Sequence, residues 1–234
     1  MVQNSLRLDW ATHQATAYAC KNWHYSKCLP VGKLVKVGAW ESGRFVGVVV
    51  FGRGATPNLC KPYGLSQVQC VELVRVALRD HAAPVSRIVA LSLKFLKQHS
   101  SGVKLVVSFA DRSQGHHGGI YQAGNWIYSG TGNDATFYMI RGKLTHPRSI
   151  GAAGKTQNIT GARQIDPKAY SVEIPGKHRY LMPLAKDMKS KIQHLAKPYP
   201  KRVRSVDSDT PAVQVGEGGA TPTRTLQKQK ASRE

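Results

Sequence analysis

The sequence lacks any apolar run that approaches the roughly 20 residues a membrane-spanning helix needs. Its first residues, MVQNSLRLDWATHQ, also lack the basic segment followed by an apolar one that marks a secretory signal peptide. We therefore expect a protein that is neither secreted nor held in a membrane.

Cysteine is scarce and irregularly spaced, at Cys20, Cys28, Cys60 and Cys70. No two of these residues form a CxxC pair, and the spacing matches no small disulfide framework. We expect four reduced thiols, with neither a structural zinc site nor a disulfide bond.

Acidic residues are few as well. The 234 residues contain 13 Asp and Glu against 34 Lys and Arg, a formal charge of +21, while 41% of the residues are hydrophobic. This hydrophobic share is too high for a disordered basic protein, and the charge is too one-sided for a typical enzyme of small metabolites. The composition indicates a folded protein with a polyanionic partner such as nucleic acid.

The composition changes near residue 196. From Ala196 onward the sequence is rich in Pro, Ser, Thr, Gly and Lys and has almost no apolar periodicity. We predict one folded domain over residues 1–195 and a disordered basic tail over 196–234. Most of the basic residues precede the tail, so nucleic-acid binding is expected of the folded body and not of the tail alone.

Hydrophobic periodicity predicts a mixed α/β (α+β) fold. The strand at 68–80, the helix that Pro84 opens and the strand at 103–111 form a crossover, which makes these two strands parallel. The remaining pairings are expected to be antiparallel, so the sheet is mixed and mostly antiparallel, with a central parallel pair and flanking helices. The other predicted elements are a helix at 11–22 capped by Asp9, a hairpin at 34–54 with its turn at 41–44, a short helix around 117–123, and strands at 135–143 and 176–184.

Polar residues gather after the predicted strand 103–111. Ser108, Asp111 and Ser113 lie at its carboxyl end, where open α/β sheets bind ligands. Gly118 and Gly119 follow and allow close approach of a ligand to the backbone. Tyr121 comes next, and it is either a catalytic group or, like Trp126, a core aromatic with a polar tip.

The order of these elements, with Ile120-Tyr121 before Gly124-Asn125-Trp126, resembles the GNAT acyltransferase core. The resemblance implies that Tyr121 protonates the leaving group. The stretch from Asp80 to Ser86 departs from the family because it lacks the glycines whose amides hold the pyrophosphate of coenzyme A. If a donor binds here, the expected contacts come from Ser86, Arg87, Gly118 and Gly119.

Three stretches resemble the Mom-type DNA modification proteins of Mu-like phages: KNWHYSKCLPVGKLVKVG (21–38), FADRSQGHHGGIYQAGNWIYSG (109–130) and PGKHRYLMPL (175–184). This resemblance implies transfer of a carbamoylmethyl group to N6 of adenine in double-stranded DNA, which protects phage DNA from restriction in the host cytoplasm. The adenine must then be flipped from the duplex. Trp23, His24 and Tyr25 are the expected wall of its pocket.

The product constrains the donor, because carbamoylmethyl carries its amide at the far end, whereas simple acyl transfer would leave an amide on N6. An activated glycine such as glycyl-tRNA satisfies this constraint after a rearrangement, and acetyl-CoA is the conventional alternative. Fe²⁺ is a further candidate cofactor, with His24 as the expected ligand.

The expected roles follow from the resemblance. Asp111 is a candidate base or orienting group and Tyr121 a candidate acid, with Ser113 beside them. Arg75 would stabilise an oxyanion or hold a donor phosphate, and Glu72 would orient Arg75, bind the acceptor or form a plain salt bridge. Two other classes stay open: a coenzyme A acetyltransferase acting on a protein or small amine, and a non-catalytic nucleic-acid-binding protein.

Overall fold

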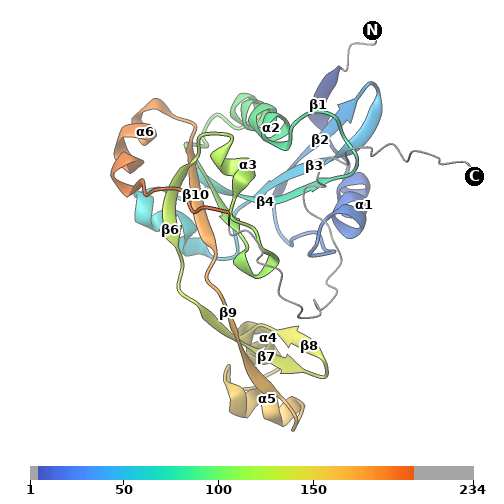
Figure 1. The fold of residues 1–234 in the computed structure, drawn as a ribbon, viewed down its shortest axis with the longest axis vertical. Helices are drawn as coiled ribbons and strands as arrows, with labels where there is room; N and C mark the ends of the chain where they lie inside the picture. The colour runs from blue at the N-terminus through green and yellow to red at the C-terminus, as the bar shows by residue number, and fades with distance from the viewer. Residues whose placement is uncertain (1–4, 203–234) are drawn as a thin grey trace, which may run out of the picture. The chain divides into compact units, whose positions relative to one another are not determined.

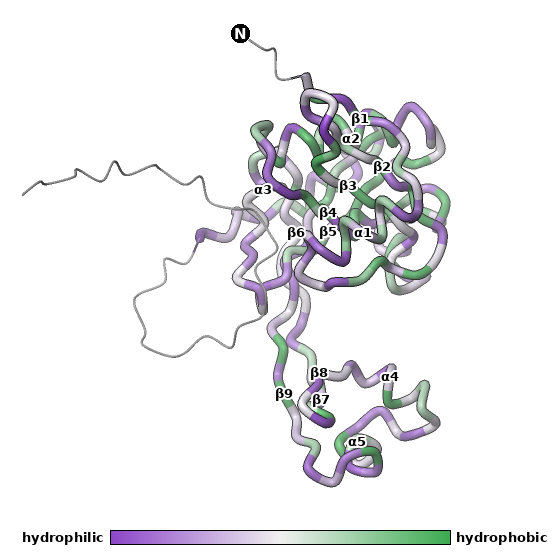
Figure 2. Tube along the Cα trace, turned by 90° about the vertical axis from the view of Figure 1, so that its right-hand side faces the viewer, coloured by the Kyte–Doolittle hydropathy of each residue, from purple (hydrophilic) through white to green (hydrophobic). Residues whose placement is uncertain are grey.

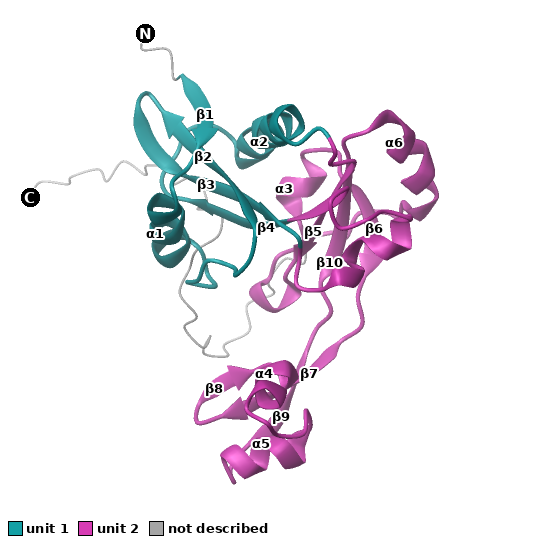
Figure 3. Cartoon of the chain, turned by 180° about the vertical axis from the view of Figure 1, so that it is seen from behind, with its two compact units in different colours: residues 1–53, 73–101, 207–234 teal, residues 54–72, 102–206 magenta. Residues whose placement is uncertain are grey.

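The computed structural model describes residues 5–202. The described chain forms two compact units (Figure 3): residues up to 53 together with 73–101, and residues 54–72 together with those from 102 onward. Each unit has hydrophobic clusters of its own.

The larger sheet is mixed, with strand order β1-β2-β3-β4-β5-β10-β6 (Figure 1). Its pairings are antiparallel apart from one parallel pair, so the predicted fold class is confirmed. The crossover runs from β4 through α2 to β5, and the amides of Lys104 and Leu105 both donate to the Gln69 carbonyl, beside the starts of β4 and β5. The strands are β1 (Leu6–Trp10), β2 (Leu34–Glu41), β3 (Arg44–Gly52), β4 (Cys70–Leu78), β5 (Leu105–Ala110), β6 (Ile127–Thr131) and β10 (His178–Pro183).

The first unit is built on the predicted hairpin. β2 and β3 pair antiparallel around the turn at Ser42-Gly43, where both residues have positive φ. β3 is an almost continuous hydrophobic run (Figure 2) and is buried nearly throughout, so both of its faces must be covered. Val48 and Val50 pack in one cluster with residues of α1 (His13–Trp23), and α2 (Val85–His99) packs on β1 and β2.

The start of this unit corrects one prediction. Asp9 does not cap the first helix, because it lies in β1, a strand that the sequence did not predict. Thr12 is the N-cap, and its hydroxyl accepts a hydrogen bond from the Ala15 amide at 3.1 Å. Both residue types are good N-caps, so local preference does not distinguish them, and pairing of residues 6–10 with β2 decides the boundary.

In the second unit, the two faces of β5 differ, since one is wholly hydrophobic and the other carries Ser108. Because side chains alternate along a strand, Leu105 and Val107 share a face with Leu181 of β10, and this face packs against α6 (Lys186–Ile192). Ser108 pairs with Tyr180 and points to the opposite face. This unit also contains the 3₁₀ helices η1 (Pro57–Tyr63), η2 (Arg112–Gln114) and η3 (Gln193–Leu195) and the short helix α3 (Gly119–Gln122).

An insertion separates β6 from β10. It forms a second sheet of order β8-β7-β9, in which the strand predicted at 135–143 ends at Ile140 and a separate strand begins at Lys143. Tyr138 and Ile140 share a small core with Ile150 and Ala162 of the two helices. The elements are β7 (Ala135–Ile140), β8 (Lys143–Thr145), α4 (Pro147–Ala152), α5 (Ile159–Ile165) and β9 (Tyr170–Ile174), and we call residues 135–174 the inserted module.

The four cysteines are free, as predicted: Cys28 is exposed and the other three are buried. Within residues 5–202 no helix is both long and apolar enough to cross a membrane. Most of the predicted tail lies outside the described residues. Of its first part, the Lys197 amide donates to the Tyr128 carbonyl and the Tyr199 hydroxyl to the Trp126 carbonyl.

Candidate functional site

The central pair of the site is formed by Ser108 of β5 and Tyr121 of α3. Ser108 is fully buried, and its hydroxyl donates a hydrogen bond to the phenol oxygen of Tyr121 at 2.7 Å. The alternation of β5 directs Ser108 to one face of the strand, and α3 directs Tyr121 onto that face. A donor on the phenol oxygen stabilises the phenolate that remains after Tyr121 gives up a proton, so the pair suits acid catalysis.

Aromatic rings surround this pair. Tyr121 lies 5.0 Å, centroid to centroid, from both Trp126 and Tyr180, and Tyr128 lies 5.3 Å from Tyr180. The Tyr180 hydroxyl donates to the His117 carbonyl at 2.6 Å. Tyr121 is therefore a core aromatic whose polar tip has an ordered partner, and its catalytic role stays a prediction.

The predicted donor-binding glycines have a packing role. Gly118 has φ of +85°, and a Cβ there would overlap the Tyr180 ring. A Cβ at Gly119 would lie 3.0 Å from the His117 ring. Gly118 thus allows the backbone to pass close to the Tyr180 ring just before α3 begins. This close approach positions Tyr121 of α3 against Tyr180.

Asp111 forms the second polar group of the site. Its Oδ1 accepts hydrogen bonds from the Ser113 hydroxyl at 2.6 Å and the Ser113 amide at 3.1 Å, and its Oδ2 lies 2.7 Å from Lys177 Nζ. Burial raises the pKa of Asp111, but the hydrogen bonds from Lys177 and Ser113 and the Lys177 charge outweigh it and hold that pKa below its ordinary value. Asp111 is therefore a carboxylate at neutral pH, which suits an orienting role better than proton abstraction.

Sequence reasoning missed Lys177, His178 and Tyr180. The signal that could have found them is the stretch 175–184, which contains all three and carried part of the family resemblance. Their role depends on the pairing of β10 with β5, which sets His178 opposite Ala110. His178 Nδ1 lies 2.9 Å from Thr131 Oγ1 and 3.2 Å from the Tyr128 hydroxyl. Burial, together with the charge of Arg112, lowers the pKa of His178.

In the first unit, Arg75 holds the segment that follows α1. Its Nε donates to the Cys28 carbonyl at 3.2 Å and its Nη1 to the Val74 carbonyl at 2.7 Å. Much of the guanidinium's hydrogen-bonding capacity is therefore used within the protein. The geometry favours Arg75 as a support of the segment 24–28 over the predicted contact with a donor phosphate.

The predicted aromatic wall divides into two parts. Trp23 is the last residue of α1 and packs against Phe45 at 5.9 Å, with the Arg79 guanidinium 5.6 Å from its ring, so it belongs to the support of the hairpin. His24 and Tyr25 lie with their rings 4.3 Å apart. The Ser26 amide donates to His24 Nδ1 at 3.1 Å, which places the proton of the neutral ring on Nε2.

The role of His24 as a ligand of Fe²⁺ stays a prediction. In the part of the chain that the structure describes, no group of three or more His, Cys, Asp and Glu residues could hold a metal ion. Glu72, on β4, is half-buried and lies near Gly54, where a Cβ would come within 2.9 Å of its carboxylate.

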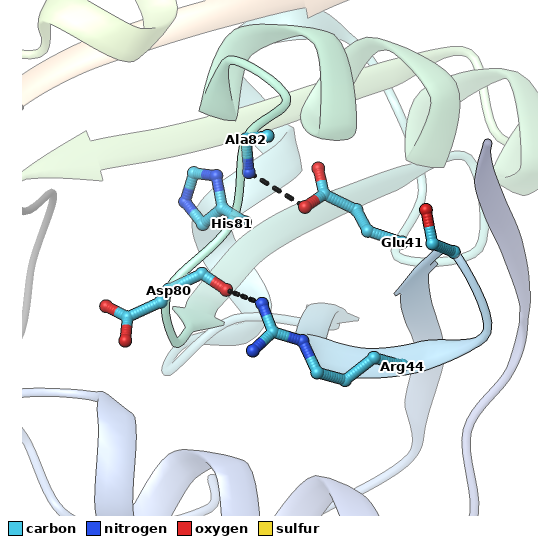
Figure 4. Close-up of a pocket in the computed structure, with 6 residues that line it drawn as sticks. Glu41, Arg44, Asp80, His81 and Ala82 are labelled. Atoms are coloured by element: carbon cyan, nitrogen blue, oxygen red, sulfur yellow. Dashed lines mark hydrogen bonds between the residues drawn. The ribbon is translucent and has the colours of Figure 1, made fainter. Parts of the chain in front are cut away.

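The loop before α2 is occupied by a carboxylate of the protein itself (Figure 4). The amides of Ala82 and Ala83 donate to the two carboxylate oxygens of Glu41 at 2.8 and 2.6 Å, and the Arg44 side chain donates to the Asp80 carbonyl at 2.9 Å. Glu41 is buried. The two amides that would otherwise meet an anion are therefore already satisfied.

The expected donor contacts Ser86 and Arg87 lie just past this loop, in the first turn of α2, where Ser86 is half-buried and Arg87 is exposed. Sequence reasoning assigned Glu41 only to the hairpin turn. Its contact with residues 82 and 83 spans some 40 positions, and no local pattern signals it.

The fold and the site together define a mixed α/β protein with a polar site at the carboxyl end of a central strand. The model of the Mom protein family matches residues 5–201, so this chain belongs to the Mom protein family. It is 26% identical over 185 residues to the methylcarbamoylase mom of Escherichia phage Mu, covering 76% of each chain.

Solved structures show a weaker likeness. A protein of Staphylococcus epidermidis described as a probable acetyltransferase is 10% identical with a TM-score of 0.43, covering 78% of this chain and 100% of its own. FeeM, an N-acyl amino acid synthase from uncultured soil microbes, is 10% identical with a TM-score of 0.40, covering 82% and 96%. The family assignment rests on the sequence match.

Proposed function

We propose that this protein is a DNA modification transferase that adds a carbamoylmethyl group to N6 of adenine in double-stranded DNA and so protects phage DNA from host restriction enzymes. Membership of the Mom protein family over residues 5–201 carries the proposal. The relative named a methylcarbamoylase and the formal charge of +21 support it, because Lys and Arg contacts to phosphate supply sequence-independent affinity for DNA.

Tyr121 and Asp111 are the proposed catalytic pair. Asp111, held as a carboxylate by Lys177, accepts a hydrogen bond from the adenine amine and orients it. Tyr121 gives its proton to the leaving group, and Ser108 then stabilises the phenolate. Because the amine lies inside the duplex, the adenine is flipped out before it reacts.

The proposed donor is an activated glycine such as glycyl-tRNA. N6 attacks the glycyl carbonyl, the ester bond breaks, and the leaving ribose oxygen takes the proton from Tyr121. The proton that N6 loses then returns to the Tyr121 phenolate, so the site ends the step unchanged. The new glycyl amine then attacks C6 through a five-membered ring, and the C6–N6 bond breaks. The attacking amine loses one proton and the departing old N6 gains one, so the old N6 becomes the terminal carboxamide. The product is N6-CH2-CO-NH2, formed without any oxidant or reductant.

The contacts of Glu41 support this donor over coenzyme A. The amides of Ala82 and Ala83 already bond a carboxylate, and a second anion there would meet the charge of Glu41. A strongly basic chain also suits the binding of two nucleic acids.

The test is mass spectrometry of nucleosides from plasmid DNA of cells that express the protein, with a Tyr121→Phe variant as control. We expect an adenosine species heavier by one carbamoylmethyl group, absent from the control. Unmodified adenosine from the wild type would contradict the proposal. Labelled glycine should enter the product, whereas entry of labelled acetate in its place would overturn the proposed donor.

A further inference from the structure

The inserted module is larger than the fold requires. β6 and β10 are antiparallel neighbours that pair at Thr131 and His178, and the Gly132 amide donates to the Lys177 carbonyl beyond them. A loop of two to five residues commonly joins such strands. The chain instead builds residues 135–174 with a hydrophobic core of their own, so the module is not needed to close the larger sheet.

The two helices of the module pack on one face of its sheet. Tyr138 and Ile140 pack with α4 and α5 on the inner face. Strand register places the alternate residues on the other face, where Met139 lies opposite both Leu144 and Tyr170. We call this side the outer face, and it consists of Phe137, Met139, Leu144, Tyr170 and Val172.

Large apolar side chains of the outer face are exposed. Leu144 is 43% and Tyr170 55% exposed, while Phe137, Met139 and Val172 are half-buried. The imidazole of His146 packs edge-on against the Phe137 ring at 4.8 Å. The face therefore offers aromatic and aliphatic groups across three adjacent strands.

The module is also strongly basic. Its six Lys and Arg side chains are all exposed, and none forms an ion pair within residues 5–202. Its two acidic residues already accept hydrogen bonds within the module. Asp166 accepts them from the amides of Arg141 and Lys168, and Glu173 accepts one from the Thr136 hydroxyl. The six are Arg141, Lys143, Arg148, Lys155, Arg163 and Lys168.

We propose that the outer face of the inserted module docks duplex DNA, with the exposed side chains of Leu144 and Tyr170 against the base steps. The phosphates are bound by Arg141 and Lys168, which lie in the turns next to Met139 and Tyr170 and whose amides both bond Asp166. Unpaired cationic charge complements a polyanion, which favours DNA over a second copy of this basic chain. Exposed apolar side chains are the groups that minor-groove-binding proteins insert between base steps to unstack them.

This inference rests on the proposed function, because duplex DNA is the proposed acceptor. The chain leaves and re-enters the larger sheet at Thr131 and His178, and Lys177, beside His178, lies 2.7 Å from Asp111. The module is thus joined to the chain directly at the proposed catalytic site. A duplex unstacked at the outer face costs less to open for base flipping.

The first arm of the test measures affinity. The full chain with Arg141→Gln and Lys168→Gln is titrated against a fluorescent DNA duplex at several salt concentrations. Binding should weaken, and the slope of log K against log salt should become shallower by about 0.9 for each phosphate that the variant no longer neutralises. The matched control changes the exposed Lys94 and Lys97 of α2 to Gln and should keep the wild-type slope.

The second arm measures unstacking by the reactivity of duplex thymines toward permanganate. The wild type should raise this reactivity, and a chain with Leu144→Ala and Tyr170→Ala should lose that rise while it keeps most of its affinity. Val68→Ala, at a residue 63% exposed, is the matched control. A thermal melt of each variant checks folding.

The outcomes separate the two proposals. Wild-type salt slope and unstacking in the module variants would overturn the docking proposal, whether or not adenine is modified. Loss of self-association, or loss of binding to tRNA with duplex binding intact, would overturn it in favour of another occupant. A wild type that binds and unstacks the duplex through the module and produces no modified adenine would contradict the proposed function alone.

Discussion

The hydroxyl of Ser108 donates a hydrogen bond to the phenol oxygen of Tyr121 at 2.7 Å, within a cluster of aromatic rings. This contact joins β5 to the short helix that follows it. It turns a residue that could have been core packing alone into the strongest candidate for an acid in the site, because Tyr121 has both a defined orientation and a partner that stabilises its deprotonated form.

Tyr121→Phe should abolish adenine modification and leave duplex binding unchanged. The Phe ring keeps its packing against Trp126 and Tyr180, while Ser108 loses an acceptor, so the variant should be less stable by about 1 kcal/mol. Nucleoside mass spectrometry, duplex titration and urea unfolding check the three parts. Ser108→Ala is the companion variant, and modification should be slower but present. Full activity of Tyr121→Phe would exclude Tyr121 as the acid.

Lys177→Met should destabilise the protein in a pH-dependent way. In the wild type, the pKa of Asp111 is lower in the folded state than in the unfolded state, where it is about 4. This difference contributes stability that is present above the unfolded pKa and is lost as the pH falls through the folded pKa. Without Lys177, only the hydrogen bonds from Ser113 oppose the effect of burial, so the pKa of Asp111 should rise. The loss should be about 1 to 2 kcal/mol at pH 7, since Lys177 is half exposed, and should shrink below about pH 4.

Urea unfolding of this variant at pH 7 and at pH 3.5 provides the measurement, with the pH scale set by the ordinary carboxyl pKa of about 4. Lys104→Met is the matched control, because Lys104 forms a looser pair with Asp187 at 3.9 Å and both side chains are exposed. It should change stability little at either pH. An equal loss for Lys177→Met at the two pH values would contradict the assigned role of the pair.

Glu41→Ala should open the loop before α2 to anions. The carboxylate that the amides of Ala82 and Ala83 bind would be gone, so inorganic pyrophosphate or coenzyme A should bind the variant more tightly than the wild type. Isothermal titration calorimetry measures both affinities. Glu173→Ala, in the inserted module, removes the same charge elsewhere and should bind neither ligand. Tight binding of coenzyme A by the wild type would contradict the proposed exclusion.

Gly118→Ala should be more destabilising than Gly115→Ala, although both glycines have positive φ. A methyl group on Gly115 would meet no atom within 4 Å, so this substitution costs only the backbone strain, about 1 to 2 kcal/mol. At Gly118 the methyl also meets the Tyr180 ring and should add about 1 to 3 kcal/mol. Thermal unfolding compares the two, and equal melting temperatures would show that the Tyr180 ring moves aside.

Particular stretches of sequence predicted much of the larger sheet. The hairpin 34–54 was visible because two runs of β-branched residues flank a short turn, and the crossover was visible because strand and helix periodicities alternate over residues 68–111. The inserted module was not predicted, since its elements are short and Ala135–Ile140 reads like any other strand. Its separate sheet is decided by which strands it pairs with.

The sequence by itself determined the charge of +21, the hairpin, the crossover and the identity of Asp111 and Tyr121 as candidates, because these depend on composition, local periodicity and motifs. Only the tertiary structure decided which partners they have. Lys177 reaches Asp111, and Glu41 reaches Ala82, across long separations in the chain that strand pairing and loop packing close. Such contacts follow from the register of paired strands, which no local pattern encodes.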